Sequence, residues 1–144
     1  MKLEEFMTRN VEVIAPEDSL FTAAKKMRDH NIGFLPVELN GSLVGVITDR
    51  DITTRSTAAG NDPQLTSVGE IMTSDVVTCY QDQTAESAAE VMNMHQIRRL
   101  IVVDKNKAVA GVVSLGDLAV DAIDSAQAGE VLKNVSYPAK PEKA

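Results

Sequence analysis

Two seven-residue segments combine a glycine, a hydroxyl side chain and a carboxylate at the same spacing. A hydroxyl at the start of a helix can donate to a phosphate, and the free helix N–H groups there favour an anion. A carboxylate about one turn later can accept hydrogen bonds from two ribose hydroxyls, as the acids of dinucleotide-binding sites do. The spacing therefore predicts a nucleotide clamp in each segment. The segments are Gly45-x-x-Thr48-x-x-Asp51 and Gly111-x-x-Ser114-x-x-Asp117.

The same side chains have a second interpretation, which is helix capping without any ligand. Serine and threonine are preferred N-cap residues, and an acid three residues later completes a capping box. The glycines have a separate meaning, because glycine in a strand marks a bend or a close approach of another backbone. Thr48 and Ser114 are thus candidates for both roles.

An arginine pair, Arg98-Arg99, precedes a run of apolar residues. Arginine binds phosphate through a rigid donor fork and stays charged, so the pair predicts an anion site. A surface ion pair with a carboxylate is the equal alternative. The other half of the chain has Gly33 and Phe34 at this point, so the two sites are expected to differ. Arg50 is a further phosphate contact or an ordinary exposed helix arginine.

Other reactive residue types predict no chemistry. His30 and His95 fall at equivalent helix ends, where a positive charge suits the dipole, and two ligands are too few for a zinc site. We therefore predict no metal. Cys79 is interpreted as a core or edge thiol without neighbours that stabilise a thiolate. Met27, Met92 and Met94 are interpreted as packing residues.

Apolar spacing predicts the elements that position these residues. Ser19 and Thr84 are N-cap types, and each is followed by one apolar helix face, which predicts helices over 19–30 and 84–95. Asn40-Gly41 between two apolar runs predicts a tight hairpin, and a longer turn at 104–107 joins the corresponding runs later.

Further elements complete each half. Second helices are expected over 49–57 and 115–126, and short first strands over 11–14 and 76–79. A short helix is expected over 67–72, and residues 135–144 are expected to form a mobile tail.

The element order is the same twice, because the chain repeats itself at a nearly constant spacing. Each repeat is predicted to be strand, helix, strand, strand, helix, with approximate two-fold symmetry between the copies. Repeats of this size bury little surface alone, so both are expected to share one α/β module. The predicted division is repeat one over 1–60, a linker over 61–66, repeat two over 67–126, and a helix end with a mobile tail over 127–144.

Composition excludes several classes of function. The chain of 144 residues has 21 acidic and 14 basic residues, a net charge of −7 and only 3% aromatic residues, which argues against nucleic-acid binding. A single cysteine, no long apolar run and no signal-peptide stretch predict a cytoplasmic protein that does not bind membranes. No catalytic triad order, metal cluster or phosphate loop is present, so we predict that it is not an enzyme.

The repeated motifs resemble a tandem pair of CBS (cystathionine beta-synthase) domains, a Bateman module. The resemblance covers roughly residues 3–125, and all of its elements occur in order, twice. Its strongest elements are the paired openings Met7-Thr8-Arg9-Asn10-Val11 and Met72-Thr73-Ser74-Asp75-Val76, Ile32-Gly33-Phe34-Leu35-Pro36-Val37, and the segment from Leu43 to Asp51.

The resemblance implies where ligands bind. Such modules commonly bind adenosine-containing ligands in clefts between the repeats, and it favours nucleotide contact over capping alone at both clamps. Glu12 occupies the position in the first repeat that is equivalent to Val77 in the second, and its carboxylate would disfavour phosphate at the second cleft. Carried over, the first cleft is Thr48, Arg50, Asp51, Val77, Ile97, Arg98 and Arg99. The second is Ile32, Gly33, Phe34, Ser114 and Asp117, with Arg99 as a bridging candidate.

The resemblance also implies a function. It predicts a stand-alone regulatory sensor that binds AMP, ADP, ATP, NAD or S-adenosylmethionine, with AMP favoured and no catalytic cofactor. Such modules usually dimerise into a flat disc, so a homodimer is expected, and ligand would signal through that dimer or an unidentified protein target. The alternative is an assembly module whose clefts stay empty.

Overall fold

The computed structural model describes residues 1–121 and 123–136. The chain forms two compact units, and each mixes segments from both halves of the sequence. Residues 12–76 and 106–109 form one, which we call the β1–β2 unit. Residues 1–11, 77–105 and 110–136 form the described part of the other, which we call the β3–β5 unit.

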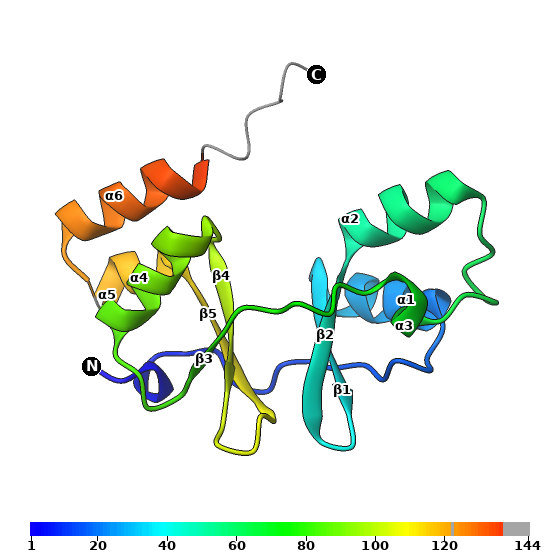
Figure 1. The fold of residues 1–144 in the computed structure, drawn as a ribbon, viewed down its shortest axis with the longest axis horizontal. Helices are drawn as coiled ribbons and strands as arrows, with labels where there is room; N and C mark the ends of the chain where they lie inside the picture. Colours follow the sequence, from blue (N-terminus) through cyan, green and yellow to red (C-terminus); the bar gives the residue numbers. More distant parts are fainter. Residues whose placement is uncertain (122, 137–144) are drawn as a thin grey trace. The chain divides into compact units, whose positions relative to one another are not determined.

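The β1–β2 unit is built on an antiparallel hairpin (Figure 1). Strands β1 (Phe34–Leu39) and β2 (Ser42–Thr48) are joined by Asn40-Gly41, whose φ angles of 53° and 79° confirm the predicted tight turn. Helix α1 (Leu20–His30) packs its apolar face on the hairpin, and Ser19 caps its N-terminus as predicted. Ala24 of the predicted apolar face is exposed.

Shorter helices complete the β1–β2 unit. A continuous helical stretch begins at α2 (Asp49–Asp51) and continues through a π-helical turn (Ile52–Ser56) and a 3-10 turn (Thr57–Ala59). The predicted helix over 49–57 is therefore present but ends two residues later. Helix α3 (Val68–Ile71) confirms the short helix expected before repeat two. The first strand expected over 11–14 is wrong, because only one bridge, from Ile14 to Val37, forms there.

The β3–β5 unit has a three-stranded sheet in the order β3, β4, β5. Its strands are β3 (Thr78–Tyr80), β4 (Arg99–Val103) and β5 (Val109–Ser114), and β3 runs parallel to β4. Helix α4 (Ala85–His95) is capped by Thr84 as predicted, and Ala85, Ala88, Ala89 and Met92 are fully buried in the core. Met94, in contrast, is 76% exposed, so its predicted packing role is wrong.

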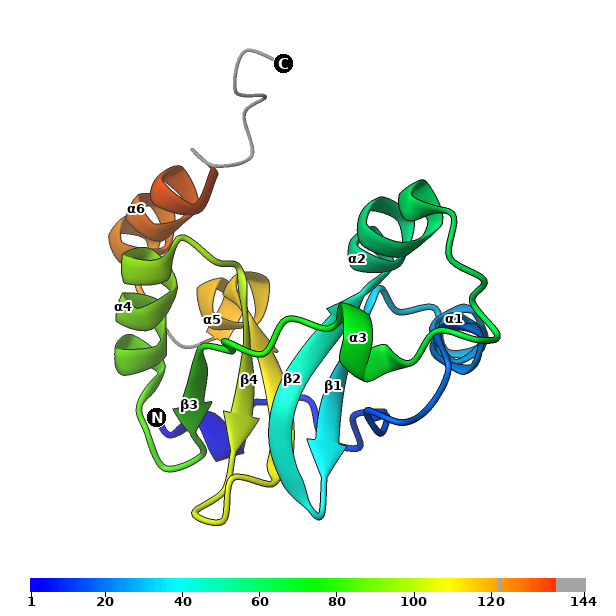
Figure 2. The same cartoon turned by 45° about the vertical axis from the view of Figure 1, so that its right-hand side comes forward.

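Two helices follow the sheet where the sequence predicted one. Helix α5 (Leu115–Asp121) ends earlier than the predicted helix over 115–126, and α6 (Ser125–Ser136) follows it. Figures 1 and 2 show α6 alongside α4. Val131 and Val135 are buried in the same core cluster as α4, so the tail predicted to begin at Val135 is wrong for its first two residues. The remainder of that predicted tail, 137–144, lies outside the described residues.

The two Met-Thr openings pair with strands of the opposite repeat. Thr8, from the first opening, exchanges backbone hydrogen bonds of 2.9 and 3.0 Å with Val112 of β5. Thr73, from the second, exchanges two bonds of 2.9 Å with Val46 of β2. Each compact unit therefore contains the opening of the other repeat.

The glycine of each clamp segment permits this pairing. A Cβ on Gly111 would lie 2.7 Å from the Thr8 carbonyl oxygen and 2.8 Å from the Met7 sulfur. A Cβ on Gly45 would lie 2.9 Å from the Thr73 carbonyl oxygen and 2.7 Å from the Met72 sulfur. These separations are shorter than van der Waals contact, which confirms the predicted close approach of another backbone.

Cys79 lies in the core of the β3–β5 unit with no exposed surface. Burial raises the pKa of its thiol from 9.0 to about 11, because the thiolate loses its solvation. Only the thiolate reacts, so at pH 8 the folded protein should be alkylated by iodoacetamide at least about 100-fold more slowly than the urea-unfolded chain. Mass-spectrometric labelling rates measure this, and equal rates in both states would contradict the buried position.

Candidate functional site

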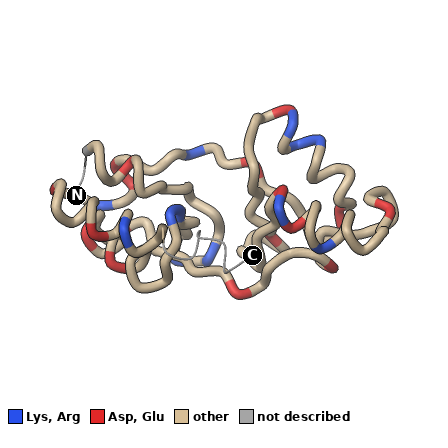
Figure 3. Tube along the Cα trace, turned by 90° about the horizontal axis from the view of Figure 1, so that it is seen from above, with Lys and Arg blue, Asp and Glu red and all other residues tan. Residues whose placement is uncertain are grey.

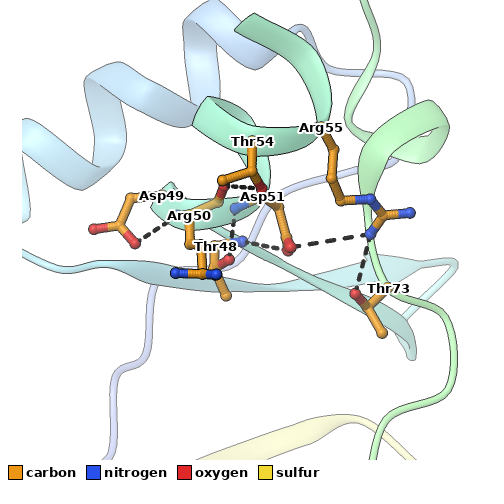
Figure 4. A network of polar contacts seen from close by, with 7 residues as sticks. All are labelled: Thr48, Asp49, Arg50, Asp51, Thr54, Arg55 and Thr73. Carbon is orange, nitrogen blue, oxygen red and sulfur yellow. Dashed lines mark hydrogen bonds and ion pairs between the residues drawn. The ribbon is translucent and has the colours of Figure 1, made fainter. Parts of the chain in front are cut away.

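The clamp segment of the β1–β2 unit forms the junction of β2 and α2. Thr48 Oγ1 accepts a hydrogen bond of 3.0 Å from the Asp51 backbone N–H, and Asp51 Oδ2 accepts one of 3.1 Å from the Thr48 N–H. This reciprocal capping box holds the hydroxyl and the carboxylate beside each other at the helix start (Figure 4). The threonine hydroxyl proton is not used in these bonds, so this hydroxyl can still donate to a ligand.

Two further residues that sequence reasoning missed lie at this junction. Arg55 Nη1 lies 3.9 Å from Asp51 Oδ1 and 3.4 Å from Thr73 Oγ1, as Figure 4 shows. The available signals were the four-residue spacing from Asp51 to Arg55 on a helix and the position of Thr73 in the Met-Thr opening. Because the opening pairs with β2, it brings Thr73 to the clamp of the first repeat. Arg50, which was predicted, is exposed on the same helical turn.

The clamp segment of the β3–β5 unit has the same geometry. Ser114 Oγ accepts a hydrogen bond of 3.1 Å from the Asp117 N–H, and Asp117 Oδ2 accepts one of 3.0 Å from the Ser114 N–H. The capping interpretation thus holds in both units. The ligand interpretation remains a prediction, and the two are compatible because each side chain retains unused hydrogen-bonding capacity.

Each helix start lies against the strand start of its own repeat. The Asp49 N–H donates to the Gly33 carbonyl at 2.9 Å, and the Leu115 N–H donates to the Arg98 carbonyl at 2.8 Å. The structure thereby brings Gly33 next to the Thr48 clamp and Arg98 next to the Ser114 clamp. Gly33 fits closely, because a Cβ there would lie 3.0 Å from Asp49 Oδ2.

The remaining predicted site residues occupy the same two units. Val77 and Ile97 are half-buried against the core of the β3–β5 unit, and Ile32 against that of the β1–β2 unit. Phe34 begins β1 and is half-buried. Each predicted cleft therefore takes residues from both compact units, and its assembly across them stays a prediction.

A cavity of about 410 Å³ lies beside the arginine pair within the β3–β5 unit, and we call it the arginine pocket. Its polar lining comes from Arg98, Arg99 and Ser114, so it joins residues that the sequence assigned to different clefts. Its other walls come from α5 and α6 and are mostly apolar. These walls are formed by Leu115, Gly116, Ala119, Ala128, Gly129 and Leu132. An apolar pocket with a few convergent charged groups is typical of a small-molecule site.

The charges suit an anion at this pocket. Figure 3 shows acidic and basic residues interspersed along the trace. The chain is acidic overall, with a net charge of −7, so the adjacent Arg98 and Arg99 form a local concentration of positive charge. Both arginines are exposed, and Arg98 Nη2 donates a hydrogen bond of 3.1 Å to Ser136 Oγ of α6. A guanidinium held at the mouth of an apolar pocket can bind a phosphate while the walls contact an attached flat group.

A small charged cluster surrounds Glu12, the residue expected to disfavour phosphate. Glu12 Oε1 lies 3.7 Å from Lys26 Nζ and 3.5 Å from His30 Nε2. Its charge is therefore partly balanced locally.

Across the described parts of the chain, no group of three or more histidine, cysteine or acidic side chains is arranged to hold a metal ion. The described helices likewise include none long and apolar enough to cross a membrane.

Comparisons with known proteins agree with this organisation. The family model of the CBS domain matches residues 3–57 and 68–121. The CBS domain-containing protein YhcV of Bacillus subtilis is 42% identical over 135 residues, covering 94% of this chain and 95% of its own length.

Three solved structures share the fold. Hypoxic Response Protein I, solved with two coordinated zinc ions, is 30% identical with a TM-score of 0.76, over 85% of this chain and 100% of that one. CBSX2 in complex with AMP is 26% identical with a TM-score of 0.69, over 81% and 92%. The CBS domain pair of MJ0100, in complex with 5-methylthioadenosine and S-adenosylmethionine, is 29% identical with a TM-score of 0.68, over 82% and 92%.

The family model matches once within each of the two sequence repeats, and the predicted α/β fold of paired repeats is confirmed. The repeated clamp, the paired Met-Thr openings and the fold all support the same assignment. This chain belongs to the CBS domain family and carries two CBS domains in tandem.

Proposed function

We propose that this protein is a regulatory module that binds an adenosine-containing ligand and transmits its presence to a protein partner. The observation that carries the proposal is the hydroxyl–carboxylate pair held at a helix start in both units. Two structural neighbours, CBSX2 and the MJ0100 domain pair, bind AMP and S-adenosylmethionine respectively, and this supports an adenosine ligand here.

Each side chain has a role in the proposed sites. Asp51 and Asp117 accept from the ribose hydroxyls, and Thr48 and Ser114 donate to phosphate. As the sequence predicts, the first cleft adds Arg50, Arg98 and Arg99 as phosphate contacts, with Val77 and Ile97 against the adenine. The same arginine pair also lines the arginine pocket beside Ser114 and can serve a phosphate there. The second adds Ile32, Gly33 and Phe34. AMP is the favoured ligand, because one phosphate matches one hydroxyl and the nearby guanidinium groups.

Isothermal calorimetry tests the proposal directly. We expect heat from at least one of AMP, ADP, ATP, NAD and S-adenosylmethionine. The double substitution Asp51→Ala with Asp117→Ala should weaken that binding by at least about 100-fold, since two hydrogen bonds to a charged acceptor are lost at each site.

Asp29→Ala is the matched control, because Asp29 is an exposed helix-end acid that pairs with Arg28 outside the clamps. It should leave the affinity unchanged. Each clamp substitution also removes a capping bond, so circular dichroism should confirm that the double variant is folded. The absence of binding heat with all five compounds would refute the proposal.

A ligand-free assembly module is the second candidate. The capping boxes favour it, because they hold both clamp side chains without any ligand. In that case the protein would form its homodimer and bind its protein target equally well with and without nucleotide. Sedimentation velocity with and without AMP separates the candidates, since a sensor requires unequal affinity of the ligand for two states.

We further propose that the protein is not an enzyme, that it acts in the cytoplasm, and that it binds neither nucleic acid nor membranes. The match to YhcV over nearly the full length of both chains supports a module without an attached catalytic domain in that relative. Turnover of ATP by the pure protein would overturn the first of these proposals.

A further inference from the structure

Helix α6 forms one wall of the arginine pocket. Ala128, Gly129 and Leu132 line it from α6, while Arg98 lines it from just before β4 and Ser114 from the end of β5. The family matches end at residue 121, so α6 belongs to neither CBS domain. Val131 and Val135 anchor the helix in the core, whereas Leu132 on the pocket side is 50% exposed. The arginine pocket thus depends on α6, a helix outside the two matched segments.

A hydrogen bond joins the last residue of α6 to the arginine pair. Arg98 Nη2 donates to Ser136 Oγ at 3.1 Å, and Ser136 Oγ in turn donates to the Leu132 carbonyl at 2.7 Å. The hydroxyl proton is therefore used within the helix, and its oxygen is directed at the guanidinium. Arg98 therefore donates to a neutral acceptor at the C-terminal end of α6, the helix that forms one wall of the arginine pocket.

A phosphate is a better partner for Arg98 than this hydroxyl. Hydrogen bonds between charged groups are roughly twice as strong as neutral ones, and a guanidinium binds phosphate through two parallel donors. Turning that fork toward an anion in the pocket draws Arg98 away from Ser136. The final turn of α6 then loses the hydrogen bond between Ser136 and Arg98, the residue just before β4.

We propose that α6 is the ligand-responsive element of this protein. An anionic group that enters the arginine pocket takes Arg98 from Ser136 and loosens the last turn of α6. The inference rests on the proposed function, because it requires that a phosphate-bearing ligand binds at Arg98. To the proposed function it adds the helix that responds to the ligand, α6, and the hydrogen bond that the ligand replaces, from Arg98 to Ser136.

Two measurements on the full chain test the inference. Hydrogen exchange of the amides of residues 131–136 is followed with AMP, with ATP and with inorganic pyrophosphate. Calorimetry with the same probes is repeated for Ser136→Ala, Ser136→Asp and the control Ser125→Ala, which makes the same change at the exposed start of α6.

We expect faster exchange in the last turn of α6 when a probe binds. Ser136→Ala removes the competing acceptor and should tighten binding by about threefold to tenfold. Ser136→Asp supplies an internal anion for Arg98 and should weaken binding by at least as much. Ser125→Ala should bind like the unaltered protein.

The outcomes distinguish the two proposals. Binding of AMP or ATP with unchanged α6 exchange and equal affinities in all variants overturns the role of α6 and leaves the proposed function intact. Pyrophosphate that alters α6 exchange, with no binding of any of the five adenosine compounds, overturns the nucleotide proposal and retains the response of α6. If no probe binds or alters exchange, the role of α6 is overturned, and the proposed function falls with it only when ADP, NAD and S-adenosylmethionine also give no heat.

Discussion

A Gly111→Val variant should lose about 2–3 kcal/mol of unfolding free energy, because a side chain there has no room. Its Cβ would lie 2.7 Å from the Thr8 carbonyl oxygen and 2.8 Å from the Met7 sulfur. The methionine can change rotamer, but the carbonyl is backbone, and Thr8 is held by two hydrogen bonds to Val112, one accepted by its carbonyl and one donated by its N–H. The first opening must therefore move away from β5, which uncovers the buried Met7.

Gly129→Ala is the matched control. Gly129 lies inside α6, and a Cβ there meets no atom within 4 Å. Alanine is the better helix former, so this variant should gain about 0.5–1 kcal/mol. Urea unfolding followed by circular dichroism measures both changes. A Gly111→Val protein as stable as the original would show that the opening does not pack on β5.

The double variant Arg98→Gln with Arg99→Gln should bind AMP about 100-fold more weakly, while its affinity for adenosine should be unchanged. Both side chains line the arginine pocket, and both lose their charge in this variant. Glutamine keeps a polar, uncharged side chain that ends two bonds short of the terminal guanidinium nitrogens. The contrast between a nucleotide and its nucleoside isolates the phosphate contribution.

Arg28→Gln controls for the loss of an exposed arginine charge away from the pocket, since Arg28 is exposed on α1 and pairs with Asp29. It should leave AMP binding as it was. Competition titrations at two salt concentrations measure the affinities, and the difference between AMP and adenosine should shrink at high salt. Equal weakening of AMP and adenosine would show that the arginines support the pocket rather than bind phosphate.

Local patterns predicted the helices and the hairpin of each repeat well. Ser19 and Thr84 cap the helices they were expected to cap, because capping depends on a hydroxyl and the next three residues. Asn40-Gly41 makes the expected turn because both positions need positive φ. At both clamps, the spacing correctly indicated that hydroxyl and acid share a helical turn, and their role toward a ligand stays a prediction.

The pairing of the openings was not predictable from the repeat itself. Both openings carry the same Met-Thr pair and both strands carry the same glycine, so each opening can pair chemically with either strand. Helix α6 was missed for a different reason. Its core contacts come from Val131 and Val135, while Gly129 weakens the helix signal, so its stability comes from packing on α4.

The exchange of openings affects how the chain acquires its structure during synthesis. Thr8 leaves the ribosome about a hundred residues before its partner Val112. Likewise, Val46 of β2 in the first repeat pairs with Thr73, which is synthesised later. Each opening therefore completes its pairing only once the opposite repeat has been synthesised, as expected of a fold rich in distant pairings.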